Sequence, residues 1–301
     1  MERWIAADWG TSNLRVWLMD ADRKLAEAGS DKGMNALQPG AFEAALLEVI
    51  DPWLRSGEVM TVVACGMVGA RQGWMEAPYR LLPCRPAAAD ATLAVATQDP
   101  RIAVSILPGL AQEEPADVMR GEETQIAGFL AKHPGFAGSL CLPGTHSKWV
   151  RLEGGQVLSF ATFMTGELFA LLAEHSVLRH SLRSDEEDEA AFLDAVLAAF
   201  RAPRSLPGRL FALRAADLLH GLAPATGRSR LSGILIGAEL AAAAGDSDGG
   251  DLGLIAGPGL GKAYLAALGA IGRDAIVESG EEMVLSGLVA ARSAIAPFPR
   301  G

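Results

Sequence analysis

The chain has 301 residues, of which 50% are hydrophobic and 21% are charged, and its formal net charge at pH 7 is −10. This length and composition are typical of a globular chain of about two domains and exclude a disordered one. The acidic balance argues against a nucleic-acid-binding surface, which needs a basic patch, but it is compatible with a locally positive cleft for an anion.

In the first third of the chain, short apolar runs between turn residues predict strands at 5–7, 14–19 and 24–28. A helix is expected from about Pro39, because apolar residues recur there on one helical face. These residues are Phe42, Leu46, Leu47 and Ile50.

Two longer apolar runs follow. They predict buried strands at 60–67, ending at Gly66, and at 101–110. The segment 118–133 is expected to begin as a loop and to continue as a helix that Pro134 and Gly135 end.

From residue 138 the strand pattern resumes. A strand at 138–145 runs into a Pro-Gly-Thr turn, and 147–160 has the strand, Gly-Gly, strand pattern of a hairpin. Helices are then predicted at 166–174, 185–200, about 210–220, 234–244, from Lys262 and at 281–294, with a short strand at 252–256. The plan of a hairpin followed by helices and parallel strands thus occurs twice.

The predicted helix at 185–200 begins in a run of five acidic residues. Ser184 is expected to be its N-cap, with Glu187 as the capping-box partner three residues later. Carboxylates there also complement the helix dipole, so we interpret the run as a solvated first turn and not as a ligand site.

The first turn, at residues 8–13, is longer than a hairpin needs and is rich in polar groups. Gly10, Thr11 and Ser12 would let backbone N–H groups and hydroxyls approach a phosphate, and Asp8 could hold hydrated Mg²⁺. The alternative is an Asx turn in which Asp8 caps local amides.

The turn after the strand at 138–145 repeats this chemistry. Gly144, Thr145 and Ser147 again place glycine and hydroxyls between two strands, and Lys148 could add a cation. An ordinary hairpin turn is the alternative, and for His146 a neutral, hydrogen-bonded ring is favoured over a catalytic role.

A third glycine-rich stretch lies at 254–264. It fails as a Walker A loop, because Ala256 and Ala263 stand where glycine and a hydroxyl are required, and its GxGxG spacing fails as a dinucleotide fingerprint. We interpret Gly257 and Gly259 as a place where adenine or ribose lies against bare backbone.

Glu122 and Glu123 stand where a loop meets the predicted helix of 118–133. A carboxylate there could accept the proton of an attacking hydroxyl. The alternative is that both carboxylates complement the helix dipole in its first turn.

The order of these turns looks like that of the acetate kinase, sugar kinase, Hsp70 and actin superfamily. Within it, six stretches between residue 4 and about residue 290 resemble the 2-dehydro-3-deoxygalactonokinase family. They are IAADWGTSNLRVWL, CGMVGARQGWMEAPY, MRGEETQIAGFL, LPGTHSKWV, TFMTGELFALL and LSGILIGAEL.

The resemblance implies an α/β, two-domain actin-like ATPase (ribonuclease H-like) fold, with five-stranded mixed sheets flanked by helices and ATP in the interdomain cleft. The expected domains are 1–121, with the substrate site, and 122–301, with the adenosine-binding turn. The C-terminal helix at 281–296 is expected near the hinge.

The activity that the resemblance implies is transfer of the γ-phosphoryl group of ATP to the 6-hydroxyl of 2-dehydro-3-deoxy-D-galactonate, in galactonate breakdown. Asp8 then becomes the Mg²⁺ partner, and Gly10, Thr11, Gly144 and Thr145 match the phosphate motifs. Glu122 stands where related kinases carry the aspartate base, and Glu123 is the fallback. The complete expected nucleotide set is Asp8, Gly10, Thr11, Ser12, Gly144, Thr145, His146, Lys148, Gly257 and Gly259.

A 2-keto acid also requires a cation, preferably a bidentate arginine. Arg15, Arg71, Arg80, Arg120 and Lys148 all lie near motif turns, and their spacing does not distinguish them. Arg71 is the first choice, because it follows the end of a strand, where α/β proteins bind ligands. The complete expected substrate set is Asn13, Arg15, Gly66, Met67, Gly69, Arg71 and Arg120.

Two alternatives stay open: a kinase for another 2-keto-3-deoxy sugar acid, and a nucleotide switch of the same fold without kinase activity. The expected partners are ATP and a sugar acid, without nucleic acid or membrane, and a homo-oligomer is left open. No signal peptide or membrane span is expected, and Cys65, Cys84 and Cys141, without CxxC spacing, are expected to be buried thiols in the cytoplasm.

Overall fold

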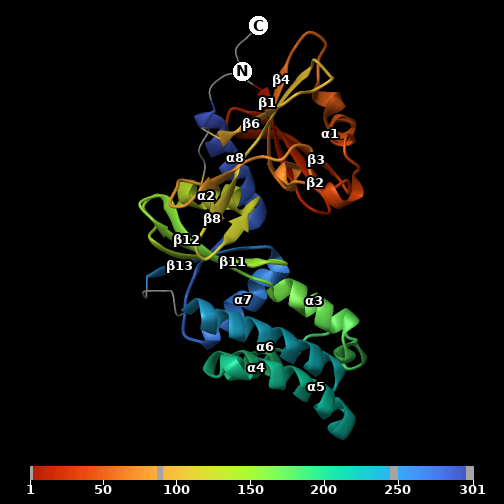
Figure 1. Ribbon diagram of the computed structural model, residues 1–301, viewed down its shortest axis with the longest axis vertical. Helices are drawn as coiled ribbons and strands as arrows, with labels where there is room; N and C mark the ends of the chain where they lie inside the picture. The colour runs from red at the N-terminus through yellow and green to blue at the C-terminus, as the bar shows by residue number, and fades with distance from the viewer. Residues whose placement is uncertain (1–2, 87–90, 245–249, 296–301) are drawn as a thin grey trace. The chain divides into compact units, whose positions relative to one another are not determined.

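The structure, a computed structural model, describes residues 3–86, 91–244 and 250–295 (Figure 1). The chain divides into two compact units. The first unit comprises Met1–Phe136, Glu153–Ser159 and Gly280–Gly301, and the second comprises Ala137–Leu152 and Phe160–Ser279. The predicted boundary after Gly121 differs from this division, which assigns the helix after Gly121 to the first unit.

The first unit is built on a six-stranded sheet with the order β3-β2-β1-β4-β7-β6. Its strands are β1 (Arg3–Trp9), β2 (Leu14–Asp20), β3 (Arg23–Ser30), β4 (Met60–Gly66), β6 (Leu93–Val95) and β7 (Ile102–Ile106). The strands β1, β4 and β7 run parallel, and β2, β3 and β6 are antiparallel to their neighbours. The predicted strands at 5–7, 14–19, 24–28 and 60–67 are confirmed, and β6 is an additional edge strand.

Helices cover this sheet through two separate apolar clusters. One contains Phe42, Leu46 and Ile50 of α1 (Phe42–Ile50), which confirms three of the four predicted core positions, while Leu47 packs at its margin. The other contains Val284 and Leu288 of α8 (Gly280–Ala294).

The helix α2 (Glu122–Lys132) packs closely against α8. A Cβ atom built at Gly128 would lie 2.0 Å from the carbonyl oxygen of Met283, and one built at Gly287 would lie 1.8 Å from that of Thr124. Gly128 and Gly287 therefore allow the two helix backbones to touch.

The prediction of one strand at 101–110 is wrong. The sheet strand β7 ends at Ile106, and Gly109 begins β8 (Gly109–Gln112) in a separate sheet with β5 (Tyr79–Leu81) and β9 (Asp117–Met119). Pro108 has no N–H group with which to continue a ladder, and Leu107 makes the last bond, to the carbonyl oxygen of Ala64 at 2.8 Å.

The second unit carries a five-stranded sheet with the order β12-β11-β10-β13-β14. Its strands are β10 (Gly138–Leu142), β11 (Ser147–Glu153), β12 (Gln156–Phe163), β13 (Asp251–Ala256) and β14 (Ile276–Ser279). This order repeats the β3-β2-β1-β4-β7 order of the first unit. The predicted repeat and the predicted hairpin at 147–160 are therefore confirmed.

The helices of the second unit are α3 (Thr165–His175), α4 (Glu189–Arg201), α5 (Leu206–His220), α6 (Pro224–Ala244) and α7 (Pro258–Ala270). Short 3-10 turns lie at Met34–Ala36, Asp51–Trp53, Met67–Gly69, Val177–His180 and Pro203–Ser205. Within the described residues, no helix has the length and apolarity needed to cross a membrane. Cys65, Cys84 and Cys141 are buried thiols, as predicted.

The helices α4 and α6 start at other residues than predicted. The helix α4 begins at Glu189, and its N-cap is Asp188, which accepts hydrogen bonds from the Ala191 N–H group at 3.0 Å and the Thr226 hydroxyl at 2.7 Å. Ser184 accepts only from the Glu186 N–H group, at 3.1 Å. The helix α6 begins ten residues before the predicted start because a polar first half, from Pro224, precedes the apolar run.

Candidate active site

Three segments of the first unit meet where β1 and β4 end. Trp9 pairs with Gly66 across these parallel strands, and Gly66 has a φ of +88°. A Cβ atom at Gly66 would lie 2.7 Å from the Trp9 carbonyl oxygen, and one at Gly121 (φ +108°) would lie 3.4 Å from the Gly66 Cα atom. Glycine is required at both positions, which brings 8–13, 66–69 and 121–123 together.

Asp8, the residue before the last one of β1, forms an ion pair. Its Oδ2 atom accepts a hydrogen bond from Arg15 Nη2 at 2.6 Å, and Arg15 Nη1 lies 3.3 Å from Glu281 Oε2. Arg15, expected at the substrate, is thus bound to two carboxylates. A single carboxylate such as that of Asp8 suits hydrated Mg²⁺, which takes one or two protein carboxylates and completes its shell with water and phosphate oxygens.

The turn after Asp8 is held from outside by the segment 33–35. The N–H groups of Gly33, Met34 and Asn35 donate to the carbonyl oxygens of Ser12, Gly10 and Thr11, at 3.2, 3.1 and 3.0 Å respectively. Thr11, Ser12 and Asn13 are exposed. The turn therefore has a fixed backbone and solvent-facing residues with hydroxyl groups.

The two glutamates at the start of α2 have different environments. Glu123 is 2% exposed and accepts hydrogen bonds from the Gly121 N–H group at 2.7 Å and the Thr124 hydroxyl at 3.2 Å. Burial, and secondly the charge of Glu122, raise the pKa of Glu123 to about 8. Glu122 is half-buried and accepts from the Arg120 N–H group at 3.1 Å.

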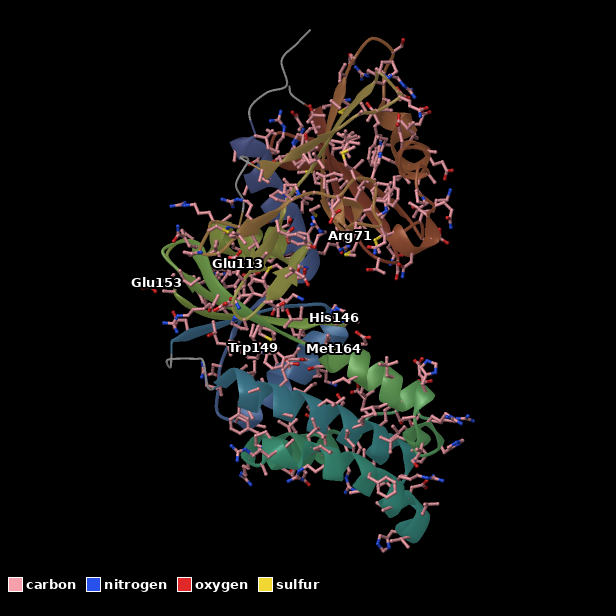
Figure 2. All side chains as sticks on the ribbon, viewed as in Figure 1. Arg71, Glu113, His146, Trp149, Glu153 and Met164 are labelled. Atoms are coloured by element: carbon pink, nitrogen blue, oxygen red, sulfur yellow. The ribbon has the colours of Figure 1, made fainter. Side chains whose placement is uncertain are left out.

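Arg71 and Arg120, two of the cations considered for a substrate carboxylate, have different environments. The Arg71 side chain is 81% exposed, and its Nε atom lies 3.5 Å from Glu76 Oε1 (Figure 2). The Arg120 guanidinium, in contrast, lies 4.2 Å from the Tyr79 ring centroid and donates a hydrogen bond to the Ala77 carbonyl oxygen at 2.8 Å. Nε and Nη1 of Arg120 are buried and have no acceptor among the described residues. An unsatisfied buried guanidinium is costly, so Arg120 is the better anion-binding candidate.

Gly69 is part of this arrangement. A Cβ atom there would lie 2.9 Å from Arg120 Nη1. Backbone hydrogen bonds hold this segment: the carbonyl oxygens of Met67 and Gly69 accept from the N–H groups of Ala70 and Ala77, at 3.0 and 2.9 Å respectively. Glycine at 69 therefore leaves room for the guanidinium.

In the second unit the turn at 143–146 joins β10 to β11. The Thr145 carbonyl oxygen accepts from the Glu167 N–H group at 3.0 Å, and a Cβ atom at Gly166 would lie 2.4 Å from the Gly144 carbonyl oxygen. The start of α3 therefore lies directly against the turn. His146 Nε2 lies 2.5 Å from Glu167 Oε2 on the surface, in agreement with the favoured interpretation of a hydrogen-bonded ring (Figure 2).

Two neighbouring cavities open beside this turn. The phosphate-turn cavity has a volume of about 290 Å³ and is lined by Gly144, Thr145, Thr165, Gly166, Phe169, Ser232, Leu235, Ile236, Leu260 and Tyr264. The second cavity, of about 350 Å³, is lined by residues of α3, α4, α6 and α7 and by the acidic run 185–189. Phe169, Ser232 and Leu260 line both, so the two cavities adjoin.

The glycine-rich stretch after β13 is the start of a helix. Gly257 is the N-cap of α7 and Pro258 is its first residue, so the prediction of a helix from Lys262 is wrong. Proline is well suited to this position because its missing N–H group would have no helical partner. Gly259 lines the second cavity, and neither Gly257 nor Gly259 has an atom within 4 Å of an added Cβ.

A buried polar cluster under the turn was not predicted. Glu239 of α6 is 3% exposed and accepts hydrogen bonds from Trp149 Nε1 at 2.8 Å and the Tyr264 hydroxyl at 2.7 Å. Ser147, whose hydroxyl we expected at a ligand, is fully buried, and Lys148 is only 4% exposed. The available sequence signal was a single acidic residue inside the apolar run 231–244.

The chain was compared with known proteins. The 2-keto-3-deoxy-galactonokinase family model matches residues 8–291. A Rhizobium meliloti (strain 1021) protein named a probable 2-dehydro-3-deoxygalactonokinase is 43% identical over 97% of both chains. The 2-dehydro-3-deoxygalactonokinase of Escherichia coli (strain K12) is 35% identical over 98% of this chain and 99% of its own.

A crystal structure gives the corresponding result for the fold. It is of a Sinorhizobium meliloti protein provisionally described as a 2-dehydro-3-deoxygalactonokinase. The two structures match with a TM-score of 0.88 at 41% identity, over 99% of this chain and 98% of the other.

Proposed function

The chain belongs to the 2-keto-3-deoxy-galactonokinase family, and from this premise we propose that it transfers the γ-phosphoryl group of ATP to the 6-hydroxyl of 2-dehydro-3-deoxy-D-galactonate. The product would be 2-dehydro-3-deoxy-6-phospho-D-galactonate, formed in galactonate breakdown. At the coarser level the chain is a sugar-acid kinase with an actin-like ATPase fold.

The observation that carries the proposal is the repeated turn. In each unit a turn with glycine and hydroxyl groups joins the first two strands of an equivalent sheet, at 10–13 and at 143–146. Phosphoryl transfer requires positioning and charge stabilisation more than covalent chemistry, and backbone N–H groups in such turns supply both. We assign Gly10, Thr11, Gly144 and Thr145 to phosphate oxygens.

The second unit would hold the nucleoside. The phosphate-turn cavity leads from Thr145 into the second cavity, which Gly259 lines. Arg228 lies 4.9 Å from the Phe169 ring centroid there, and apolar and aromatic walls with a few polar groups are typical of small-ligand sites. The charge of Mg²⁺, held through Asp8, would neutralise the phosphate oxygens when the ion is bound.

The first unit would hold the sugar acid. Arg120 is assigned to the substrate carboxylate, because two of its N–H groups lack an acceptor among the described residues. Glu122 is assigned as the base that takes the proton of the attacking hydroxyl, because it is half-buried and hence accessible. Glu123, almost fully buried, would instead hold the Gly121 N–H group in place.

A coupled ADP-release assay with purified protein tests the proposal. The panel contains the galacto and gluco forms of 2-keto-3-deoxy sugar acid, the corresponding acid reduced at the keto group, and no sugar acid. We expect ADP release that requires a 2-keto acid and is fastest with the galacto form. Equal release with and without sugar acid would refute kinase activity, and a preference for the gluco form would refute the named substrate.

A further inference from the structure

Glu239 is a charged residue in the apolar core of the second unit. Its side chain is 3% exposed, and its helix neighbours Ile236 and Leu240 belong to the hydrophobic core of this unit. A buried carboxylate is unfavourable unless donors surround it. Its surroundings therefore indicate what it does.

Three side chains supply those donors. Trp149 Nε1 donates to Oε1 at 2.8 Å, the Tyr264 hydroxyl donates to Oε2 at 2.7 Å, and the Thr165 hydroxyl is also hydrogen-bonded to the carboxylate. The Ser147 hydroxyl lies 3.0 Å from the Tyr264 hydroxyl oxygen and donates to it, because the Tyr264 proton goes to Glu239. Both carboxylate oxygens are thus hydrogen-bonded. Burial raises the pKa of Glu239, and these hydrogen bonds oppose the shift.

The donors come from the elements that form the phosphate-turn cavity. Ser147 directly follows the turn at 143–146, Thr165 begins α3 beside Gly166, and Tyr264 lies in α7, which begins after Gly257. Thr165 and Tyr264 themselves line this cavity with Gly144. One buried carboxylate is thus hydrogen-bonded to the turn strand, α3 and α7.

We propose that Glu239 is a positioning residue for the nucleotide, which sets the geometry of the phosphate-turn cavity through the hydrogen bonds that it accepts from Trp149, Thr165 and Tyr264, the last of which also binds the Ser147 hydroxyl. This inference rests on the proposed function, because it takes that cavity as part of the ATP site. Buried ionic groups can often be replaced by apolar ones without loss of stability, so fold stability does not by itself require a carboxylate here.

The substitution Glu239→Gln tests the inference at nearly constant shape. The amide NH₂ group is a donor and would face side chains that are themselves donors, which displaces at least one of the three elements. The full-length variant is examined by ADP titration calorimetry, and the KM values for ATP and for sugar acid are measured. Glu174→Gln, an exposed residue of the same unit, is the matched control.

We expect Glu239→Gln to raise the Kd for ADP and the KM for ATP at least ~10-fold, with the KM for sugar acid changed less than about twofold, because displacements of an ångström at a site have effects of this size or larger. The control should match the wild type. A folded Glu239→Gln protein with lower thermal stability but unchanged ADP affinity would overturn the inference, since a purely structural role gives that result.

Trp149→Phe provides a second test if Glu239→Gln does not fold. It removes one donor from a side chain that does not line the cavity, and we expect a roughly two- to fivefold rise in the Kd for ADP. An unchanged Kd would overturn the inference. A wild-type chain that binds no ADP would overturn the proposed nucleotide site as well, whereas normal ADP binding by wild type and variants would overturn this inference alone.

Discussion

The two units have the same strand order but place their charged groups differently around the first turn. In the first unit, Asp8 pairs with Arg15 across β1 and β2 just before the turn. At the corresponding place in the second unit, Leu142 pairs with Lys148 across β10 and β11. Beneath the turn of the second unit a carboxylate, that of Glu239, lies in the core, and Glu167 lies on the surface beside His146.

This difference shows how one topology serves two roles. In the roles proposed above, the first unit keeps Asp8 near the end of β1 and Glu122 at the start of α2, both only partly buried, where they would act on a metal ion and on a proton. The second unit keeps Glu239 in its core and offers the phosphate-turn cavity, whose walls are mostly backbone, hydroxyl and apolar groups, while the adjoining second cavity also carries the acidic run 185–189. The following predictions test this division between a reactive unit and a binding unit.

The largest expected effect concerns stability and Glu123 of the first unit. The pKa of Glu123 in the folded protein, about 8, exceeds the ordinary value of 4.5. Its contribution to the free energy of unfolding is therefore fully present below pH 4.5, where the carboxyl is protonated in both states, and is lost as the pH rises through 8. We expect the free energy of unfolding to fall by about 3–5 kcal/mol over this range relative to Glu123→Gln, which stays neutral. Denaturant unfolding of both proteins from pH 5 to pH 8.5 measures the difference, and parallel pH profiles would contradict it.

The second expected effect concerns catalysis in the same unit. Glu122→Gln should lower kcat at least ~10²-fold, the usual scale for removing a general base, and should leave ADP affinity unchanged. Steady-state kinetics with calorimetry checks this. Glu123→Gln serves as the comparison, and a larger loss of kcat there than in Glu122→Gln would transfer the role to Glu123.

A third, smaller effect is expected at the sugar-acid site. Arg120→Lys should raise the KM for sugar acid roughly tenfold, because an ammonium cannot replace a planar fork that binds a carboxylate, and the KM for ATP should not change. The same change at Arg71, which is 81% exposed, should alter neither value more than about twofold. The reverse ranking of the two variants would make Arg71 the carboxylate anchor.

The smallest effect is expected on the surface of the second unit. His146→Gln removes the imidazole that is hydrogen-bonded to Glu167, and a single intramolecular hydrogen bond contributes about 0.5–1.5 kcal/mol. We expect a correspondingly small loss of stability and a kcat within about twofold of the wild-type value. A tenfold or greater fall in kcat would give the second unit a reactive residue and would break the proposed division.

Much of the fold could be predicted from the sequence because its signals are local. Short apolar runs between turn residues predicted the first three strands, and Gly154 and Gly155 predicted the hairpin of β11 and β12. Errors arose where two local signals competed. An apolar run outweighed Pro108 in the predicted strand at 101–110, and Ser184 was preferred to Asp188 as the cap of α4.

The site was only partly predictable. Both turns with glycine and hydroxyl groups were found, because turn chemistry is written in consecutive residues. The choice among the arginines could not be made, since it depends on burial and on acceptors distant in the chain. Arg120 is held by the carbonyl oxygen of Ala77, 43 positions away, and by the ring of Tyr79.

By itself, the sequence determined the strand and helix pattern, the two turns and the family, because periodicity, turn residues and motif order act between near neighbours. Only the tertiary structure decided that Arg120 has unsatisfied N–H groups, that Glu123 is buried and that Glu239 joins Trp149 across 90 positions. Burial and hydrogen-bond satisfaction are properties of packed neighbours, and packing brings together residues whose separation along the chain gives no sign of contact.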